Sequence, residues 1–176
     1  RSRLSDESIA QVQALLPRVL PAHPRVPIRL LVRASNALGA NALALPDGTI
    51  IVTDGMVRLA WNEDNQLDAD GTAELLGVLA HEVGHIELRH ATRVMTGSSL
   101  TAALSATLFG DFSAVAAGLP AVLTQMQYSR PMELEADDYA AGVLRRNGLE
   151  PDALADILQA LERQQPGQED VPRWLR

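Results

Sequence analysis

Two histidines and a glutamate form the motif whose residue types and spacing most clearly predict chemistry. His81, Glu82 and His85 make an HExxH pattern in the stretch His-Glu-Val-Gly-His at 81–85. On a helix, residues four apart share a face, so both imidazoles can bind one ion at about 2.0–2.1 Å. Glu82 projects beside this pair, where it can take a proton from a metal-activated water. The pattern predicts a catalytic site with one zinc ion per chain.

A catalytic zinc site needs a third protein ligand, and the chain has no cysteine. Acidic residues cluster in the stretch Glu-Leu-Glu-Ala-Asp at 133–137. On a helix Glu133 and Asp137 share a face, while Glu135 points to nearly the opposite side. We therefore expect Glu133 to be the third zinc ligand and Asp137 to accept a hydrogen bond from a histidine ring. Favourable interaction with the helix dipole is a competing explanation for these acids, and it can account fully for Glu135.

The other histidines are not expected to bind the ion. His90 lies five residues after His85, about 140° further round a continuous helix, so we interpret it as structural. His23 lies in a proline-rich loop. The sequence contains neither the G-x-S-x-G pattern of a nucleophilic serine nor a glycine-rich phosphate loop. Metal-dependent hydrolysis is therefore favoured over these alternatives.

The elements that position these motifs are predicted to be mostly helical, with a small sheet in an α+β fold. Aromatic residues make up only 3% of the chain, so the core must consist mainly of Leu, Ala and Val, which favours helices. The expected helices span residues 5–20, 54–61, 72–95, 129–147 and 151–164, and the expected strands span 28–32, 41–45 and 49–53. Pro46-Asp47-Gly48 predicts a hairpin turn between the last two strands. Gly84, costly in mid-helix by about 1 kcal/mol, suggests a close approach to that helix.

The stretch between the HExxH motif and the acidic motif at 133–137 is unusually apolar. Between Arg93 and Arg130 the only charged residue is Asp111. Gly110 and Pro120 divide the stretch into pieces of roughly 10 to 14 residues, which is shorter than a membrane span. Two interpretations stay open for 97–128: a pair of buried helices, or a hairpin that faces a membrane surface beside the active site.

Charge and length limit the remaining classes of function. The net charge is −7 and no basic stripe is visible, so a nucleic-acid partner is not expected. The 176 residues suffice for one domain, and we expect 1–176 to be a single catalytic domain. The chain begins with Arg1 and has no signal-peptide pattern, from which we expect it to be a piece of a longer, membrane-anchored protein.

Three stretches of the chain carry a family resemblance. They are residues 41–55, the HExxH motif, and the Ser-Arg-Pro-Met-Glu-Leu-Glu-Ala-Asp run at 129–137. Together they resemble the HtpX-like and CaaX-prenyl-protease family of membrane-associated zinc metallopeptidases. The resemblance implies a gluzincin-type, minigluzincin-like fold, with a small sheet beside the HExxH helix and a second helix that supplies Glu133 as the third ligand.

The resemblance also implies how the protein binds its substrate and which segment lies near a membrane. The strand formed by Asn41, Ala42, Leu43 and Ala44 would be an edge that holds an extended substrate through main-chain hydrogen bonds. Because the segment between the zinc motifs is often apolar or membrane-embedded in this family, the resemblance also favours a position of residues 100–122 near a membrane. One departure is that similar family members continue with a Thr-His-Pro segment near the active site, about where this chain ends at 172–176.

The sequence therefore predicts a zinc-dependent endopeptidase that cleaves extended or unfolded protein segments, with Glu82 as general base. We expect it to be membrane-associated in the cell envelope and to serve protein quality control there. The alternative is a zinc-stabilised binding or chaperone-like domain with little hydrolysis, although a closed structural zinc site would need no Glu82. A weaker alternative is a membrane-surface scaffold that uses 97–128. Candidates for stabilising an oxyanion are Tyr128, Arg130 and Tyr139.

Overall fold

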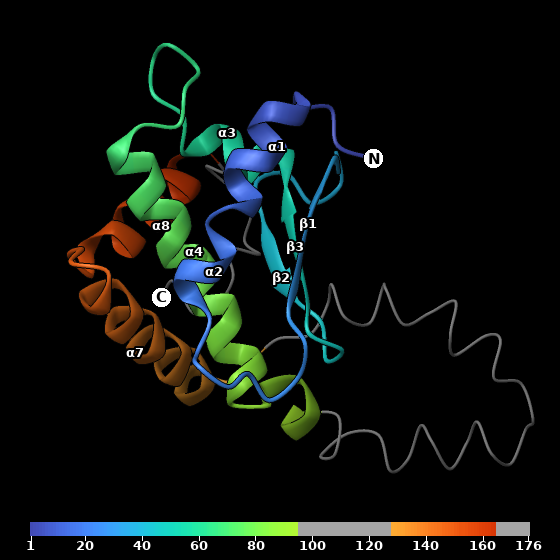
Figure 1. The fold of residues 1–176 in the computed structure, drawn as a ribbon, viewed down its shortest axis with the longest axis vertical. Coiled ribbons are helices and arrows are strands. Elements are labelled where there is room, and N and C mark those ends of the chain that lie inside the picture. The colour runs from blue at the N-terminus through green and yellow to red at the C-terminus, as the bar shows by residue number, and fades with distance from the viewer. Residues whose placement is uncertain (95–127, 165–176) are drawn as a thin grey trace, which may run out of the picture.

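Helices dominate the fold, and a three-stranded sheet lies beside them (Figure 1). The computed structural model describes residues 1–94 and 128–164. The helices are α1 (Asp6–Gln13), α2 (Leu16–Val19), α3 (Asp54–Leu59), α4 (Ala69–Glu87), α7 (Arg130–Arg146) and α8 (Asp152–Gln164). The strands are β1 (Arg29–Arg33), β2 (Ala42–Ala44) and β3 (Thr49–Thr53). The predicted fold class, α+β and mostly helical with a small sheet, is confirmed.

The sheet is built around β3, with β1 parallel to it on one side and β2 antiparallel on the other. The predicted hairpin is confirmed, because Ala42 pairs with Val52 and Ala44 with Ile50. Its turn requires a glycine: Gly48 has a φ of 85°, and a Cβ there would lie 2.3 Å from the carbonyl oxygen of Pro27. Because the strand order is β1-β3-β2, β2 is an edge strand within the described sheet.

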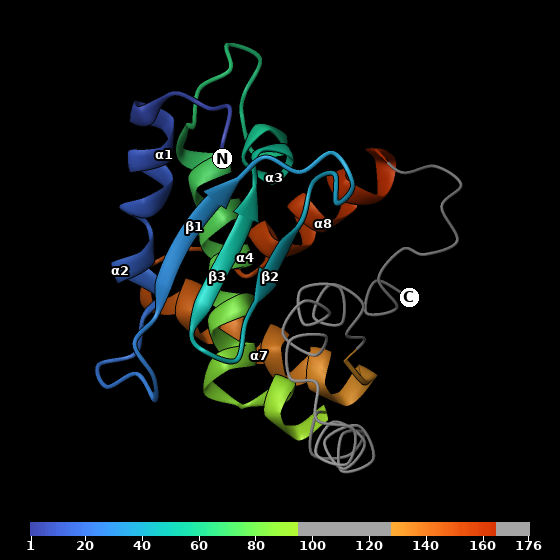
Figure 2. The same cartoon turned by 90° about the vertical axis from the view of Figure 1, so that its right-hand side faces the viewer.

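Helix α4 packs on one face of the sheet, and α7 and α8 pack on the other side of α4 (Figure 2). Its buried residues before the HExxH motif are all aliphatic or glycine, and Leu75, Leu76 and Leu79 are at most 1% exposed. They belong to the same buried cluster as Ile50 and Val52 of β3, which are also fully buried. Burial of an aliphatic side chain contributes about 1.5–3 kcal/mol, so this cluster fixes α4 firmly against the sheet.

The N-terminal segment forms two helices rather than the single helix expected over residues 5–20. α1 ends at Gln13, and α2 begins at Leu16 with Pro17 in its first turn. Pro17 has no backbone N–H, and within a continuous helix its ring would clash with the carbonyl group of Gln13. The proline therefore restarts the helix, and its signal was present in the sequence.

The HExxH helix is also shorter than expected. It was predicted over 72–95, but α4 begins at Ala69, capped by Asp68, and ends at Glu87. Arg89 has a φ of 55°, in the left-handed region, where it breaks the helix. Helical backbone resumes over residues 90–94 in a new direction. The break decides where His90 points.

Two expectations from the sequence concern residues that the structure does not describe. The apolar segment 97–128 lies outside the described residues except for Tyr128, and so does the tail from residue 166 onward. Among residues 1–94 and 128–164, no helix combines the length and the apolar character needed to cross a bilayer.

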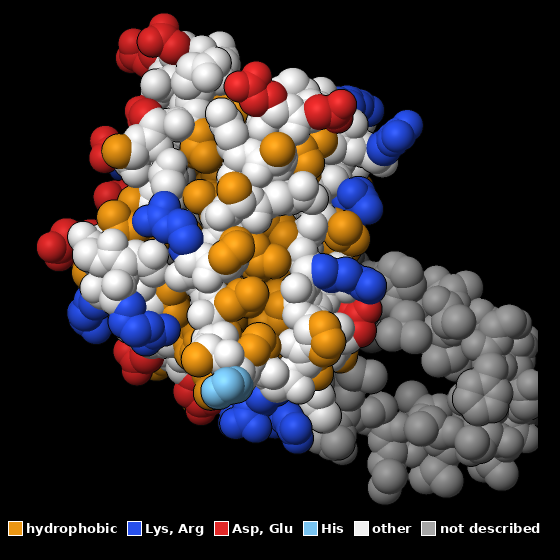
Figure 3. All heavy atoms as spheres, viewed as in Figure 1, with side chains coloured by type: hydrophobic (Ala, Val, Ile, Leu, Met, Phe, Trp, Pro, Cys, Tyr) orange, Lys and Arg blue, Asp and Glu red, His pale blue; other side chains and the backbone are white. Residues whose placement is uncertain are grey.

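Charged side chains surround a hydrophobic strip on the face drawn in Figure 3. Acidic and basic side chains both lie around the rim of this face, and hydrophobic side chains lie between them. Among the large hydrophobic residues that the structure describes, only Leu134 is strongly exposed, at 55%. The helices therefore turn nearly all their large apolar side chains at least partly inward, as their periodicity predicts.

Candidate active site

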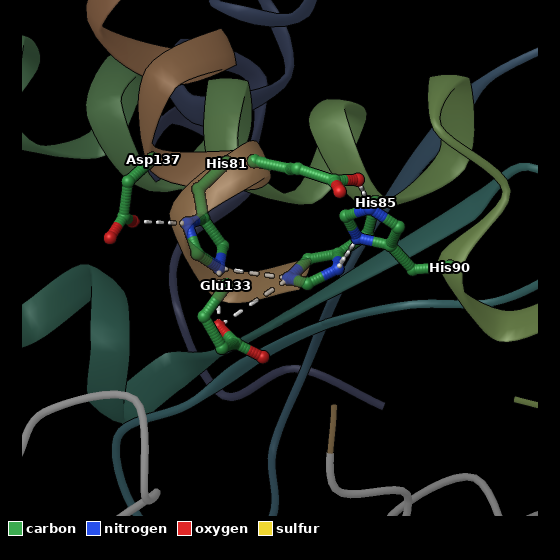
Figure 4. Close-up of polar contacts among 6 residues, drawn as sticks. His81, His85, His90, Glu133 and Asp137 are labelled. Carbon is green, nitrogen blue, oxygen red and sulfur yellow. Dashed lines mark hydrogen bonds and ion pairs between the residues drawn. The ribbon is translucent and has the colours of Figure 1, made fainter. Parts of the chain in front are cut away.

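The candidate active site lies where α4 passes the start of α7. His81 and His85 stand one turn apart on α4, and Glu133 lies in the first turn of α7. Their side chains converge in Figure 4. The Nε2 atoms of His81 and His85 are 2.9 Å apart, and Glu133 Oε2 lies 3.4 Å from the first and 3.8 Å from the second. The structure thus brings together the three residues predicted to be zinc ligands.

Small residues let α7 approach α4 closely enough for this convergence. A Cβ added at Gly84 would lie 3.2 Å from Tyr139 Cβ and 3.3 Å from Ala136 Cα, both on α7. Pro131 lies in the first turn of α7, where its missing N–H costs no hydrogen bond. The close approach expected from Gly84 is therefore observed, and its partner is the helix that carries Glu133.

The three side chains fit a zinc ion. Their ligand atoms lie within 4.8 Å of one another, and all three residues are buried. In a tetrahedral zinc site with bonds of 2.0–2.1 Å, ligand atoms lie about 3.3 Å apart, close to the observed separations. Glu133 Oε2 is buried and has no hydrogen-bond partner among the described residues. An acceptor left without a donor in this way is costly, and a cation held by two imidazoles and a carboxylate would remove the cost.

The two histidine rings have opposite affinities for protons. Burial alone would lower the pKa of His81, but the carboxylates of Asp137 and Glu133 raise it to about 10. Burial and the positive charge on His81 lower the pKa of His85 to about 2. A proton on His81 Nε2 can therefore bridge to the bare Nε2 of His85. A metal cation would take the place of that proton, so its binding competes with protonation.

Asp137 supports the ring of His81. Its Oδ1 lies 2.9 Å from His81 Nδ1, and the two residues come from α7 and α4 (Figure 4). A carboxylate only accepts hydrogen bonds, so Nδ1 of His81 carries the proton and donates it. This contact turns Nε2 of His81 toward His85 and Glu133. The predicted position of Asp137 behind a histidine is therefore observed.

His85 has a support that the sequence reasoning missed. His90 is fully buried, and its Nδ1 lies 2.8 Å from Nδ1 of His85. The other ring nitrogen, His90 Nε2, lies 3.0 Å from Glu135 Oε2, which also accepts from Arg93 at 2.7 Å. The interpretation of Glu135 as only a partner of the helix dipole is wrong, because the turn at Arg89 brings His90 within its reach. The expectation that His90 is not a ligand agrees with the geometry.

Glu82 lies beside the two histidines and is itself 9% exposed. Burial raises the pKa of Glu82 to about 7, although the positive charge of His81 and a hydrogen bond from the backbone of Ala44 oppose the rise. A carboxyl with a pKa near neutrality can both take and release a proton, as a general base must. Its contact with Ala44 links it directly to the edge strand β2.

The three candidates for an oxyanion donor lie in different surroundings. Tyr128 stacks on the ring of His85, with centroids 4.1 Å apart and planes 19° apart. Burial, with the negative charges of Glu82 and Glu133, raises the pKa of Tyr128, so its hydroxyl stays a donor. Tyr139 instead packs against Gly84, and Arg130 is exposed at the start of α7. Tyr128 is therefore the candidate that lies against a proposed ligand.

A cavity of about 200 Å³ opens beside His85. Ala44, at the end of β2, and Leu45 after it form one part of its lining. Ile86 at the end of α4, Arg89 in the turn that follows, and Tyr128 form another part. The cavity therefore connects the edge strand with the histidine cluster.

Comparison with known proteins places this geometry in a family. Residues 7–175 match peptidase family M48. The chain is 32% identical over 140 residues to metalloprotease LoiP of Escherichia coli, covering 76% of this chain and 52% of that protein. It is 31% identical over 137 residues to the beta-barrel assembly-enhancing protease of Yersinia pestis, covering 70% of this chain and 26% of that one.

A plant protein shows the same likeness. The chain is 30% identical over 122 residues to the mitochondrial metalloendopeptidase OMA1 of Arabidopsis thaliana, covering 69% of this chain and 23% of that protein. The chain spans about half the length of LoiP and about a quarter of the other two. The matched family is broader than the HtpX-like and CaaX-prenyl-protease group that the sequence resembles. The predicted class, a metalloendopeptidase, is confirmed, and the chain belongs to peptidase family M48.

Proposed function

We propose that this chain is a zinc-dependent endopeptidase domain that cleaves extended or unfolded protein segments. The observation that carries the proposal is the convergence of His81, His85 and Glu133 on one point, where Glu133 Oε2 is buried without a hydrogen-bond partner among the described residues. Three protein ligands leave one position of a tetrahedral zinc open, which is the arrangement of catalytic rather than structural zinc.

The residues of the chain would divide the work as follows. His81 and His85 through Nε2, and Glu133 through its carboxylate, would hold the ion, and Asp137 would orient His81. When bound, zinc would supply Lewis acidity to the scissile carbonyl and lower the pKa of the attacking water. Glu82 would accept the proton of the attacking water and later pass it to the leaving amine. The raised pKa of Glu82 suits both transfers, since the group must accept a proton, hold it between the two steps and then release it.

The edge strand would hold the substrate. Asn41 and Leu45 hydrogen-bond to β3, and bonds alternate along an antiparallel pair. Ala42 and Ala44 therefore turn their backbone N–H and C=O groups toward the open edge, and Ala44 meets Glu82 there. An extended segment that pairs with Asn41, Ala42, Leu43 and Ala44 would lie next to the general base. Recognition through the main chain demands little sequence and suits unfolded protein.

The cellular setting is also part of the proposal. One relative is named for enhancing beta-barrel assembly, and the sequence resembles membrane-associated HtpX-like enzymes. We infer a role in quality control of envelope proteins, with the chain acting as one catalytic domain at a membrane surface. The segment 97–128 is the stretch whose composition suggests contact with that surface.

Cleavage of an unstructured protein such as casein tests the proposal. Glu82→Gln should keep zinc but lower the rate by orders of magnitude, since the proton acceptor is lost. Glu63→Gln, the same change at an exposed loop residue, should leave both zinc content and rate unchanged. Zinc content should be read on the same samples by mass spectrometry. Zinc bound by wild type without any cleavage would instead favour the binding or chaperone-like domain.

A further inference from the structure

The two histidines of the proposed zinc site are supported by different means, and the second support has no assigned role. We propose that His90 is a positioning residue: held by Glu135, it fixes His85 in the tautomer that presents Nε2 to the ion. The inference rests on the proposed zinc site, because it assigns a role relative to His85 as a ligand.

The contacts form an unbroken chain from the surface to the site. Glu135 lies on α7, half exposed, and its Oε2 lies 3.0 Å from His90 Nε2. His90 Nδ1 lies 2.8 Å from His85 Nδ1, and the two rings meet nearly at right angles, at 74°. His85 Nε2 faces His81 and Glu133 on the far side of its ring (Figure 4).

The donor and acceptor chemistry of these groups fixes the direction of both hydrogen bonds, from His85 to His90 and from His90 to Glu135. The carboxylate of Glu135 only accepts, so the proton on His90 sits on Nε2. Nδ1 of neutral His90 is then bare and accepts from Nδ1–H of His85. With its proton on Nδ1, His85 has a free lone pair on Nε2. The opposite arrangement would place the His85 proton on Nε2, where it would block metal binding.

The backbone around Arg89 makes this support reachable. On a continuous helix His90 would point about 140° away from His85. The left-handed Arg89 turns the chain, so that the buried imidazole of His90 comes back against the ring of His85. Tyr128 stacks on the same ring, 4.1 Å from it between centroids. His85 is thus fixed by one hydrogen bond in its plane and one ring on its face.

One turn of α7 would then act on the whole site. Glu133 supplies the carboxylate ligand, Asp137 reaches His81 directly, and Glu135 reaches His85 through His90. Partners of this kind typically change metal affinity by about 10–100-fold when removed. A competing explanation is that His90 only fills buried space and satisfies its own nitrogens.

Two substitutions at His90 separate these explanations. His90→Leu keeps the bulk but cannot accept a hydrogen bond, whereas the Oδ1 of His90→Asn can occupy the place of Nδ1 and accept. We expect about 10–100-fold weaker zinc binding for His90→Leu and a change below about 3-fold for His90→Asn. The measurement is competition with a chromophoric chelator, starting from metal-free protein. His23→Leu, at an exposed histidine, is the matched control and should bind like wild type.

Thermal unfolding of the metal-free variants separates packing from positioning. Asparagine is smaller than histidine, so a packing role predicts that His90→Asn loses more stability and more zinc affinity than His90→Leu. That order of affinities, or equal affinities for the two variants, would overturn the proposal. The proposal predicts the reverse order for zinc affinity, whatever the order of stability.

Nitrogen-15 NMR of the wild-type rings keeps the proposal testable if the variants fail to fold. We expect a protonated Nδ1 on His85, and on His90 a protonated Nε2 with a bare Nδ1, in the metal-free protein as well. A proton on Nδ1 of His90 would contradict the proposed positioning of His85 by His90. Failure of wild type to bind zinc would instead count against the proposed function, and the tautomers of the two rings would still test the role of His90.

Discussion

The two sides of the candidate zinc site differ in how the chain builds them. On one side, Asp137 of α7 reaches His81 directly, at 2.9 Å. On the other, Glu135 of the same helix reaches His85 only through His90. The first contact joins two regular helices, whereas the second depends on the left-handed residue Arg89 after α4 ends. A regular helix therefore carries one support, and an irregular turn carries the other.

Substitution of the residue common to both sides should have the largest effect. Glu133→Gln removes the carboxylate that faces both histidines, so we expect zinc affinity to fall by more than the roughly 100-fold upper limit for supporting residues. The pKa of His81 should fall at the same time, because the carboxylate of Glu133 helps to raise it. Chelator competition measures the affinity, and NMR titration of the metal-free protein measures the pKa.

An opposite sign for either effect of Glu133→Gln would break this account. Zinc affinity equal to that of wild type would show that Glu133 is not a ligand. Glu150→Gln, at an exposed residue after α7, is the matched control and should change neither quantity.

Loss of the direct support should have the next largest effect. Asp137→Ala leaves His81 Nδ1 without its acceptor, and we expect zinc affinity to fall by about 10–100-fold. The pKa of His81 should also fall, since the contact with Asp137 helps to raise it. Chelator competition gives the affinity, and NMR titration of the metal-free protein gives the pKa. Asp138→Ala, at the exposed neighbouring position, should leave both unchanged.

A comparison of Asp137→Ala with His90→Leu sharpens the contrast between the two sides. Similar losses would show that the indirect support is as effective as the direct one. A loss confined to Asp137→Ala would mean that His85 needs no positioning by His90.

The smallest expected effect comes from the turn itself. Arg89→Val puts a β-branched residue at a φ of 55°, which should cost about 1–2 kcal/mol of stability and shift His90 away from His85. Arg89→Gly fits the same conformation without strain and should keep zinc affinity near wild type. Urea unfolding and chelator competition test both variants. Equal zinc affinities for the valine and glycine variants would show that the turn does not matter for the site.

The regular parts of the fold and site could be predicted from the sequence. His81, His85, Glu133 and Asp137 follow helical spacing, so a periodicity of 3.6 residues was enough to place them on facing surfaces. The hairpin turn is predicted by proline, aspartate and glycine at 46–48, and the flanking strands do pair. The break at Pro17 could also have been read, because proline in mid-helix loses a hydrogen bond.

The irregular parts could not be predicted, for a physical reason. Arginine has no preference for the left-handed region, so nothing at Arg89 signals that the helix ends there. The tertiary packing of His90 against His85 and Glu135 stabilises that turn, and a sequence shows such packing only after the fold is known. The parallel pairing of β1 with β3 is of the same kind, since it joins strands that are not neighbours along the chain.

Diffraction at the zinc absorption edge, on crystals of zinc-loaded protein, tests the central claim most directly. We expect one strong anomalous peak between α4 and α7, about 2.0–2.2 Å from His81 Nε2, His85 Nε2 and a carboxylate oxygen of Glu133. His90 should lie behind His85 without touching the ion. A peak elsewhere, or an ion bound by His90 in place of Glu133, would contradict the account.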